Sequence, residues 1–323
     1  MSMNNTSSKK ELSAIFSVMA VMIGVFFFFA HMVFGAGSPV ASQVTVGSTA
    51  PAMGTVTVNG GNTIQLVPNG TTSTPITAQV NDYNGCTDFT NGTATIMLYD
   101  SAVGSSTCLA QGGTGNSNTC YIASAFTTSS CAGSLVNTTT SFNVQYFAKA
   151  TDASSSQPSA NWRATVIFHA PSGSTTTADS AAGATPDVAT LMAFNLATSS
   201  INYGTVNASQ NTGTTNQTTS LQNYGNASSG MYLYGTMFVN QASSTLTMAT
   251  TSQLYATSSF NAGSAGVQLT DVQTTQISGY TLTAATTTSL SSSSVLWGLS
   301  VPGGTATGTY NATNTFSALF ISS

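Results

Sequence analysis

Hydrophobic and polar residues alternate with a period of two along most of this chain, in short runs separated by Gly, Asn, Ser and Pro. Three clear examples are residues 94–99, 142–147 and 163–168, in which apolar side chains recur at every second position. Successive side chains of a strand point to opposite faces of a sheet, so the alternation predicts antiparallel strands with one buried face. After residue 43 no run has the pattern of a capped amphipathic helix. The sequence therefore predicts an all-β fold.

Strand-like runs recur at intervals of roughly 8 to 12 residues, which is typical of β-sandwiches and barrels. Residues 171–186 (PSGSTTTADSAAGATP) are small and polar, with no apolar face to bury, and are interpreted as a linker. They separate a cysteine-containing part, residues 43–170, from a cysteine-free part, residues 187–323. Each part has a length that suits one sandwich, so we expect two tandem β-sandwich domains.

An apolar segment precedes the β-rich region. Lys9 and Lys10 are followed, after Glu11, by residues 14–36, which contain no charged side chain. This run is long enough to cross a hydrocarbon layer of about 30 Å as a helix, and it is longer than the core of most secretory signals. Its length therefore favours a membrane anchor.

Cleavage of this segment is the alternative. Val33 and Gly35 are small residues at the spacing that signal peptidase accepts, and a small, Pro-containing stretch follows them. We therefore interpret residues 1–42 as a signal peptide or a membrane anchor. Both interpretations keep the two lysines inside and place the rest of the chain outside the cell or on its surface.

The chain contains four cysteines, all of them after the apolar segment: Cys86, Cys108, Cys120 and Cys131. An even number of cysteines in an exported chain predicts two disulfides, formed in an oxidising compartment. Four cysteines allow three pairings, and the sequence does not choose among them. A zinc site is disfavoured because there is no CxxC motif and the spacings match no zinc finger. We expect the bridges to hold long, Gly-rich loops such as residues 111–118.

Charged side chains are scarce: the 323 residues include only four Lys and Arg and eight Asp and Glu. Four cations are too few to neutralise the phosphates on which nucleic-acid affinity depends, and the pI of about 4.6 has the wrong sign for it. A hydrolytic triad needs a histidine, and outside the apolar segment there is only His169, with no G-x-S-x-G motif. We therefore expect a protein that is not an enzyme and has no nucleic-acid partner.

Several short motifs resemble secreted surface proteins of ultra-small, host-associated bacteria, a largely uncharacterised family. Residues 81–88 (NDYNGCTD), 143–152 (NVQYFAKATD) and 161–166 (NWRATV) resemble a cysteine-containing β module found in these proteins. Residues 201–206 (INYGTV), 224–226 (YGN) and 301–310 (VPGGTATGTY) resemble the immunoglobulin-like module that often follows it. The resemblance implies two tandem Ig-like sandwiches at the cell surface, and it implies no activity. The relatives carry further cysteines around the strand at Phe142, so their disulfide pattern does not transfer.

Acidic and amide side chains suggest a calcium site in the cysteine-containing part. The candidate ligands are Asp82, Asn84, Asp88 and Asp152, and calcium prefers such oxygen ligands in loops between strands. Asp82 and Asn84 share one turn, and strand pairing would bring Asp152 to them. The alternative interpretation is that these residues form turns by bonding to their own backbone.

Two features of the sequence relate to carbohydrate: a pair of aromatic residues and a set of N-glycosylation sequons. Tyr232 and Tyr234 lie two residues apart on one sheet face, as a sugar platform requires, although alternating aromatics are more often core residues. N-glycans would keep a nearly uncharged surface soluble. After the apolar segment, sequons begin at Asn69, Asn91, Asn137, Asn207, Asn216, Asn226 and Asn311.

The charge pattern also suggests a function. Residues 187–323 contain no Lys, Arg or His. Nearly neutral surfaces tend to associate, and strand edges are usually protected by Lys. We expect a non-enzymatic extracellular structural protein, a subunit of a surface layer, filament or stalk that assembles with identical copies through strand edges or strand donation. The alternative is an adhesin whose disulfide-held loops bind a host glycan or protein.

Overall fold

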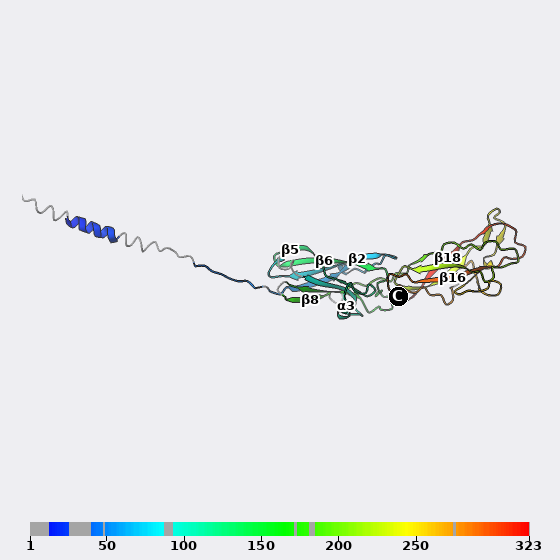
Figure 1. Ribbon diagram of the computed structural model, residues 1–323, viewed down its shortest axis with the longest axis horizontal. Helices are drawn as coiled ribbons and strands as arrows, with labels where there is room; N and C mark the ends of the chain where they lie inside the picture. Colours follow the sequence, from blue (N-terminus) through cyan, green and yellow to red (C-terminus); the bar gives the residue numbers. More distant parts are fainter. Residues whose placement is uncertain are drawn as a thin grey trace, which may run out of the picture. The chain divides into compact units, whose positions relative to one another are not determined.

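The computed structural model describes residues 13–25, 40–47, 49–86, 93–170, 173–180, 185–273 and 276–322 (Figure 1). The chain divides into two compact units, Met1–Gly47 and Ser48–Ser323. In the first unit, residues 13–25 are α-helical and residues 40–47 form no helix or strand. Within the described ranges, none of the helices combines the length and the hydropathy of a membrane span. The interpretation of residues 1–42 as a signal peptide or anchor stays a prediction.

The second unit consists of antiparallel sheets, which confirms the all-β prediction. Besides strands it contains a short helix, α3 (Ser105–Gln111), and two 3-10 turns, Asn59–Gly61 and Thr250–Ser252. For brevity, strands β1 to β8 are called the N-terminal module, and strands β9 to β18 the C-terminal module. The expected assignment of both modules as Ig-like sandwich domains with boundaries at residues 43, 171 and 187 stays a prediction.

Two four-stranded sheets form the N-terminal module. One has the order β1-β2-β6-β5, with β1 (Ala52–Val58), β2 (Thr71–Asn81), β6 (Leu135–Gln145) and β5 (Thr127–Ala132). The other has the order β4-β3-β7-β8, with β4 (Cys120–Ala123), β3 (Thr93–Asp100), β7 (Trp162–His169) and β8 (Thr175–Asp179). The period-two runs at residues 94–99, 142–147 and 163–168 coincide with β3, the end of β6 and β7, because alternation matches the pleat of a half-buried strand.

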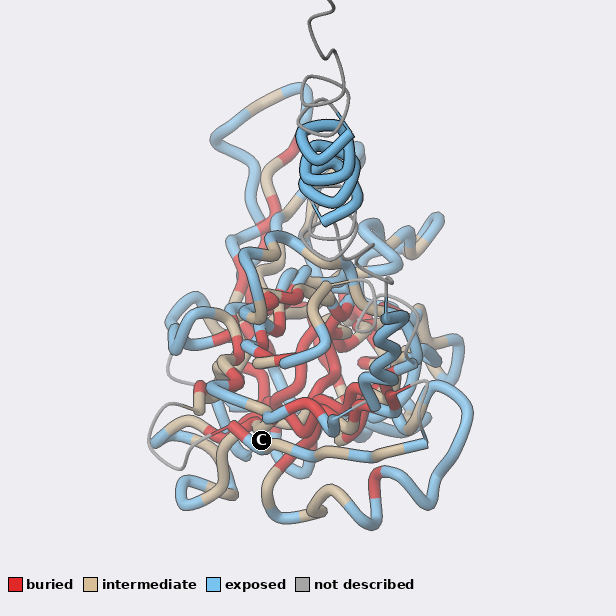
Figure 2. The backbone as a smooth tube through the Cα atoms, turned by 90° about the vertical axis from the view of Figure 1, so that its left-hand side faces the viewer, coloured by how far each residue is buried: buried red, intermediate tan, exposed pale blue. Residues whose placement is uncertain are grey.

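The inward faces of these two sheets share one hydrophobic core. Val58 and Ile76 come from one sheet, whereas Leu98 and Phe168 come from the other. Trp162 is fully buried in the same core, and its indole Nε1 donates to the carbonyl oxygen of Lys149 at 2.9 Å. In Figure 2 the buried backbone forms the inside of the unit, and exposed loops surround it. Trp162 is therefore a core anchor, as its position in a strand-like run predicts.

The structure corrects the interpretation of residues 171–186 as a linker. Residues 175–179 form β8, which pairs with β7 from Thr165 opposite Asp179 to His169 opposite Thr175. Consecutive Thr residues can form an edge strand because β-branched side chains suit a pleated surface even when they are polar. The side chain of Ala178 also packs against the core. The segment lacks large apolar residues, and for this reason its strand was missed.

Three sheets form the C-terminal module. The largest has the order β15-β14-β16-β10-β9, with β15 (Val267–Gln268), β14 (Gln253–Ala256), β16 (Ser292–Leu299), β10 (Gln217–Asn223) and β9 (Phe194–Leu196). The second pairs β11 (Ser228–Gly235) with β18 (Asn314–Ser322). The third has the order β13-β12-β17, with β13 (Thr247–Met248), β12 (Phe238–Asn240) and β17 (Tyr310–Asn311).

The first two of these sheets enclose a second core. Leu221 and Trp297 face it from the five-stranded sheet, and Met231 and Leu233 face it from β11. Trp297 is fully buried, and its Nε1 donates to the hydroxyl of Thr219 at 2.9 Å. Phe316 of β18 also packs against this core but is only partly buried. The core is therefore less completely covered on the side of β18.

Candidate functional site

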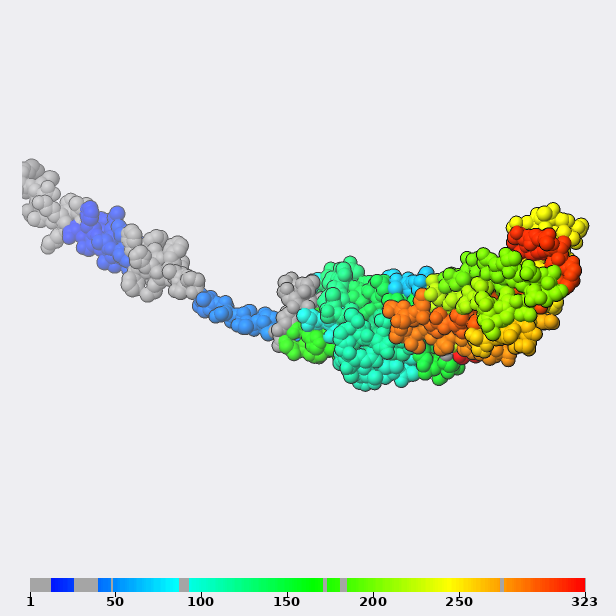
Figure 3. Space-filling model, turned by 45° about the vertical axis from the view of Figure 1, so that its right-hand side comes forward, coloured from blue at the N-terminus to red at the C-terminus, as the bar shows by residue number. Residues whose placement is uncertain are grey.

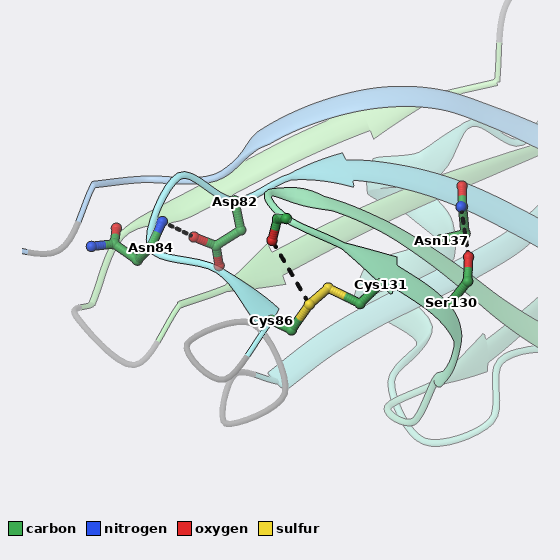
Figure 4. The surroundings of a disulfide bond; sticks show 7 residues. Asp82, Asn84, Cys86, Ser130, Cys131 and Asn137 are labelled. Carbon is green, nitrogen blue, oxygen red and sulfur yellow. Dashed lines mark hydrogen bonds between the residues drawn. A yellow bond between two sulfur atoms is a disulfide. The ribbon is translucent and has the colours of Figure 1, made fainter.

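Asp82 and Asn84, two of the candidate calcium ligands, lie in a turn directly after β2 (Figure 4). The backbone N–H of Asn84 donates to Asp82 Oδ1 at 2.9 Å. Asn84 Oδ1 in turn accepts from the backbone N–H of Thr49 at 2.6 Å. The first contact is that of a turn-forming side chain, whereas the second joins the turn to the chain before β1. Asp88 lies outside the described residues.

Asp152 is held by hydrogen bonds from the chain itself. Its Oδ2 accepts from the backbone N–H of Thr190 at 2.6 Å, and its Oδ1 accepts from the hydroxyl of Thr190 at 2.7 Å. Ser154 also donates to Oδ1, from its hydroxyl at 2.9 Å and its backbone N–H at 3.2 Å. Burial raises the pKa of this carboxyl, but the bonds from Thr190 and Ser154 outweigh it and hold the pKa below 3.8. Both oxygens therefore serve as acceptors within the fold.

The structure does not bring Asp82 and Asp152 together, which corrects the expectation of a single site. Asp82 follows the end of β2 at which Asn81 pairs with Leu135, whereas Asp152 follows the opposite end, at which Thr71 pairs with Gln145. The strand between these ends spans about 33 Å, far more than the 2.3–2.6 Å of a calcium–oxygen bond. Among the described residues, no three His, Cys, Asp or Glu lie close enough together to hold a metal ion. Asp82 and Asp152 therefore do not share one calcium site.

Both predicted disulfides are present, and the structure assigns their pairing. Cys108 of α3 bonds to Cys120 of β4, and both residues are fully buried. This bridge encloses the Gly-rich loop at residues 111–118, as expected. Cys86 bonds to Cys131 of β5 and is only partly buried (Figure 4). It ties the segment after β2 to the edge strand of the same sheet.

His169, the only histidine considered for catalysis, lies at the exposed end of β7. Its Nδ1 is 3.2 Å from the hydroxyl of Thr175, the residue that pairs with it in β8. Tyr232 and Tyr234 are not core residues, since they alternate with the buried Met231 and Leu233 and are half-buried on the other face of β11. The two tyrosines therefore share a face, as the sugar-platform idea requires.

A buried carboxyl group at the end of β3 was not singled out from the sequence. Asp100 is 1% exposed, and its Oδ1 accepts from the backbone N–H of Ala102 at 2.9 Å. Burial raises its pKa, while this hydrogen bond and the positive charge of Lys149 act in the opposite direction. Its neighbour in the turn, Gly104, precedes α3. Asp100 therefore holds the turn that leads into the disulfide-bonded helix.

One buried side chain at the junction of the two modules, Asn226, bonds to segments on both sides. Its Oδ1 accepts from the backbone N–H of Leu191 at 2.7 Å. Its Nδ2 donates to the carbonyl oxygens of Ala148 at 2.8 Å and of Ala189 at 3.1 Å. The residue is 4% exposed, so its sequon cannot carry a glycan while these bonds exist. Asn226 therefore links the N-terminal module, the connecting chain and the C-terminal module.

Close backbone packing and apolar contacts surround Asn226. A Cβ at Gly225 would lie 2.0 Å from the carbonyl oxygen of Leu191, so only glycine fits there. Tyr146 and Phe147 of the N-terminal module form a small buried cluster with Ala285 of the C-terminal module. In Figure 3 the orange atoms of the C-terminal module accordingly lie against the green atoms of the N-terminal one. The junction is closely packed, and the two modules form one compact unit.

The C-terminal module contains an open cleft of about 860 Å³. One wall is formed by residues 196–208 and the other by residues 305–314 together with Phe316 of β18. Apolar side chains lie along it: Leu196, Ile201, Tyr203, Val206, Phe238, Met248, Leu299, Val301, Tyr310, Ala312 and Phe316. Its polar groups are amides and hydroxyls, and it contains no Asp, Glu, His, Lys, Arg or Cys. The chemistry of this lining suits the binding of a neutral, partly apolar partner.

The backbone along both walls of the cleft has unused hydrogen-bonding groups. Within the described ranges, residues 198–206 belong to no strand and make no backbone hydrogen bond to a neighbouring strand. β18 pairs with β11 along one edge, and no described strand pairs with its other edge. The cleft is thus bordered by a strand-free segment on one side and by the start of β18, which has an open edge, on the other.

The tyrosine at the base of the cleft is fixed by a hydrogen bond. Gln253 Nε2 donates to the hydroxyl of Tyr203 at 2.6 Å. Burial raises the pKa of this phenol, and the bond from Gln253 offsets only part of that effect. The hydroxyl therefore stays protonated and Tyr203 acts as a neutral wall residue. The cleft was missed from the sequence because it results from missing strand partners and not from a residue motif.

Of three comparisons with known proteins, only the one with solved structures found a match. No protein-family model matches the chain, and no curated protein matches it. Among solved structures, the chain is similar to one in the CsuC–CsuE chaperone–tip adhesion subunit pre-assembly complex from archaic chaperone-usher Csu pili of Acinetobacter baumannii. The TM-score is 0.36 at 11% identity, with 83% of this chain and 99% of that chain covered. A likeness of this size is too weak to identify a common function.

Proposed function

We propose that this protein is a non-enzymatic extracellular structural subunit, which assembles with identical copies into a surface layer, filament or stalk. The observation that carries the proposal is the cleft of the C-terminal module, with the open edge of β18 on one side and the strand-free residues 198–206 on the other. Open edges are templates for pairing with another chain, and natural proteins usually protect them with charges. No charged residue lines this cleft.

Other features support the same proposal. Two disulfides suit an extracellular location, since such bonds persist in oxidising compartments. The packed junction at Asn226 holds the two modules together, which suits a subunit that keeps the same geometry from copy to copy in an assembly. In this proposal both modules are Ig-like sandwiches, the chain resembles surface proteins of ultra-small, host-associated bacteria, and residues 1–42 export it or anchor it in the membrane.

One observation favours a second candidate, an adhesin. Tyr83 is 68% exposed in the turn between Asp82 and Asn84, and the nearby Cys86–Cys131 bond holds this turn at the tip of the N-terminal module. An exposed aromatic on a rigid loop is suited to contact a host glycan or protein.

Electron microscopy of the native cell surface separates the two candidates. A repeating lattice or fibre that is labelled by antibodies to this chain is the result expected for a structural subunit. Isolated molecules without repeat contradict the structural role and are the result expected for the adhesin. Purified protein that remains monomeric at high concentration also argues against self-assembly.

A further inference from the structure

We propose that residues 40–47 of one copy of the chain insert as an added β-strand into the cleft of a second copy. In the complex this donor segment lies between residues 198–206 and the open edge of β18. The inference rests on the proposed self-assembly, and it names the segment and the surface that produce it.

The cleft offers an inserted strand backbone partners on both sides. Residues 198–206 belong to no strand, and the last backbone bond before them in the fold runs from Ala197 to Ser220 at 2.8 Å. Within this segment the N–H of Gly204 already donates to Asn202 Oδ1, so the free backbone groups are those of the residues around that turn. On the other wall, β18 uses only the edge that faces β11. A strand placed between them would satisfy two rows of N–H and C=O groups, which is the source of affinity in strand addition.

The cleft also offers a donor strand apolar surface to cover. Ile201, Tyr203 and Phe316 pack against the core of the C-terminal module, yet all three remain partly exposed. Side chains on one face of an inserted strand would contact these residues. Their burial would then provide an apolar contribution in addition to the backbone bonds.

Residues 40–47 have the properties of such a donor. Val40, Val44 and Val46 lie at even spacings, so they share one face of a strand, and they are 86%, 83% and 79% exposed. Valine has high β propensity, and the segment forms no strand of its own. Neither this segment nor the cleft lining carries a charged side chain, so insertion desolvates no charge. Eight residues span about 26 Å as a strand. Residues 198–206, nine in number, would span about 30 Å if fully extended.

The chain between Gly47 and Ala52 is too short for the donor segment to enter the cleft of its own copy, so the donor comes from another copy. Gly47 is separated from Ala52 by at most about 18 Å of extended chain. Ala52 pairs with Asn81, and β2 runs from there over about 33 Å to Thr71. The C-terminal module begins only beyond that end, where the N–H of Asn69 donates to Tyr224 at 3.0 Å. Residues 40–47 therefore cannot fill the cleft of their own chain.

A donor at one end and an acceptor cleft elsewhere give a head-to-tail contact. Such heterologous contacts extend to open chains unless the rotation between copies closes a ring. The inference therefore favours a filament or stalk over a closed oligomer.

Paired substitutions in the full-length protein test the donor segment. Val44→Asp puts a charge on the face that enters the cleft, whereas Thr45→Asp puts the same charge on the opposite face one residue away. Burying an unpaired carboxylate is costly, so we expect Val44→Asp to weaken self-association by tenfold or more in sedimentation experiments and Thr45→Asp to change it little. Both residues lie outside the second compact unit, and equal melting temperatures of the two variants check that the fold is intact.

A peptide with the sequence of residues 40–51 tests the cleft directly. We expect it to bind the full-length protein and to slow amide hydrogen exchange in residues 198–206 and 314–322, whereas the same peptide with Val44→Asp and Val46→Asp does not. If wild type and Val44→Asp assemble equally, or if the peptide leaves exchange in the cleft unchanged, the donor inference is wrong and the proposed structural role can stand. If wild type does not assemble although the peptide protects the cleft, the donor site is supported and the structural role is wrong.

Discussion

Asn226 Nδ2 donates to the carbonyl oxygen of Ala148 at 2.8 Å, across the junction of the two β modules. The same side chain accepts from the N–H of Leu191 at 2.7 Å, so one amide uses its donor and acceptor groups to join three segments. Because Ala148 is fully buried, its carbonyl oxygen has no water to replace the bond when the amide is removed, and Leu191 is itself half-buried. The junction thus depends on the chemistry of asparagine.

Asn226→Ala should therefore destabilise the protein by about 2–4 kcal/mol, since it leaves buried N–H and C=O groups without partners. Denaturant unfolding measures this loss. Asn207→Ala is a matched control because Asn207 is exposed, and it should change stability little. Equal stabilities of the two variants would show that the Asn226 network contributes nothing.

Gly225→Ala should also destabilise the junction. The added Cβ would lie 2.0 Å from the carbonyl oxygen of Leu191, so the backbone must shift. We expect a melting temperature clearly below that of wild type. Gly47→Ala is the control, since a Cβ there meets nothing within 4 Å. Wild-type stability of Gly225→Ala would mean that the modules do not pack this closely in solution.

Asp152 predicts a pH dependence of stability. Its folded pKa lies below 3.8, so the ionised carboxyl stabilises the fold above that pH, and the stabilisation is lost as the pH falls through the folded pKa. Asp152→Asn should lower the melting temperature at pH 7, and the difference from wild type should shrink below about pH 4. A difference that is constant between pH 7 and pH 3 contradicts this role.

The two disulfides should differ in their sensitivity to reductant. Cys86 and Cys131 are partly exposed, whereas Cys108 and Cys120 are fully buried. Mild reduction of folded protein, followed by alkylation and mass spectrometry, should label Cys86 and Cys131 first. Because their bond closes the longer loop, its removal should also cost more stability, about 4 kcal/mol against about 3 kcal/mol. First labelling at Cys108 or Cys120 would contradict the assigned burial.

Much of the fold can be predicted from the sequence because burial on one face of a strand leaves a period-two pattern. This pattern located β3 and β7, and the long aromatic side chains of Trp162 and Trp297 marked the two cores. The strand β8 was not predicted because it begins with three consecutive Thr residues, so apolar and polar positions do not alternate along it. The pairing of the cysteines depends on contacts between distant residues, and residue spacing does not contain it.

The candidate site was predictable only in part. Absence of Lys, Arg and His pointed to residues 187–323 as a surface for association, and the cleft lies within them. The cleft itself could not be located, because an unpaired strand edge is defined by the neighbours that it lacks. The pairing of Asp82 with Asp152 failed for a related reason: both residues follow strands, but at opposite ends of the paired strands β2 and β6. A role for Asn226 likewise has no signal in a single sequence.

Amide hydrogen exchange of the wild-type protein, measured at low and high concentration, tests the central claim that the cleft is the assembly surface. If copies associate through it, exchange in residues 198–206 and along β18 should slow as the protein assembles, whereas exchange in the exposed turn around Tyr83 should stay unchanged. Protection of the turn around Tyr83, with the cleft segments still exchanging as in dilute protein, would contradict the account.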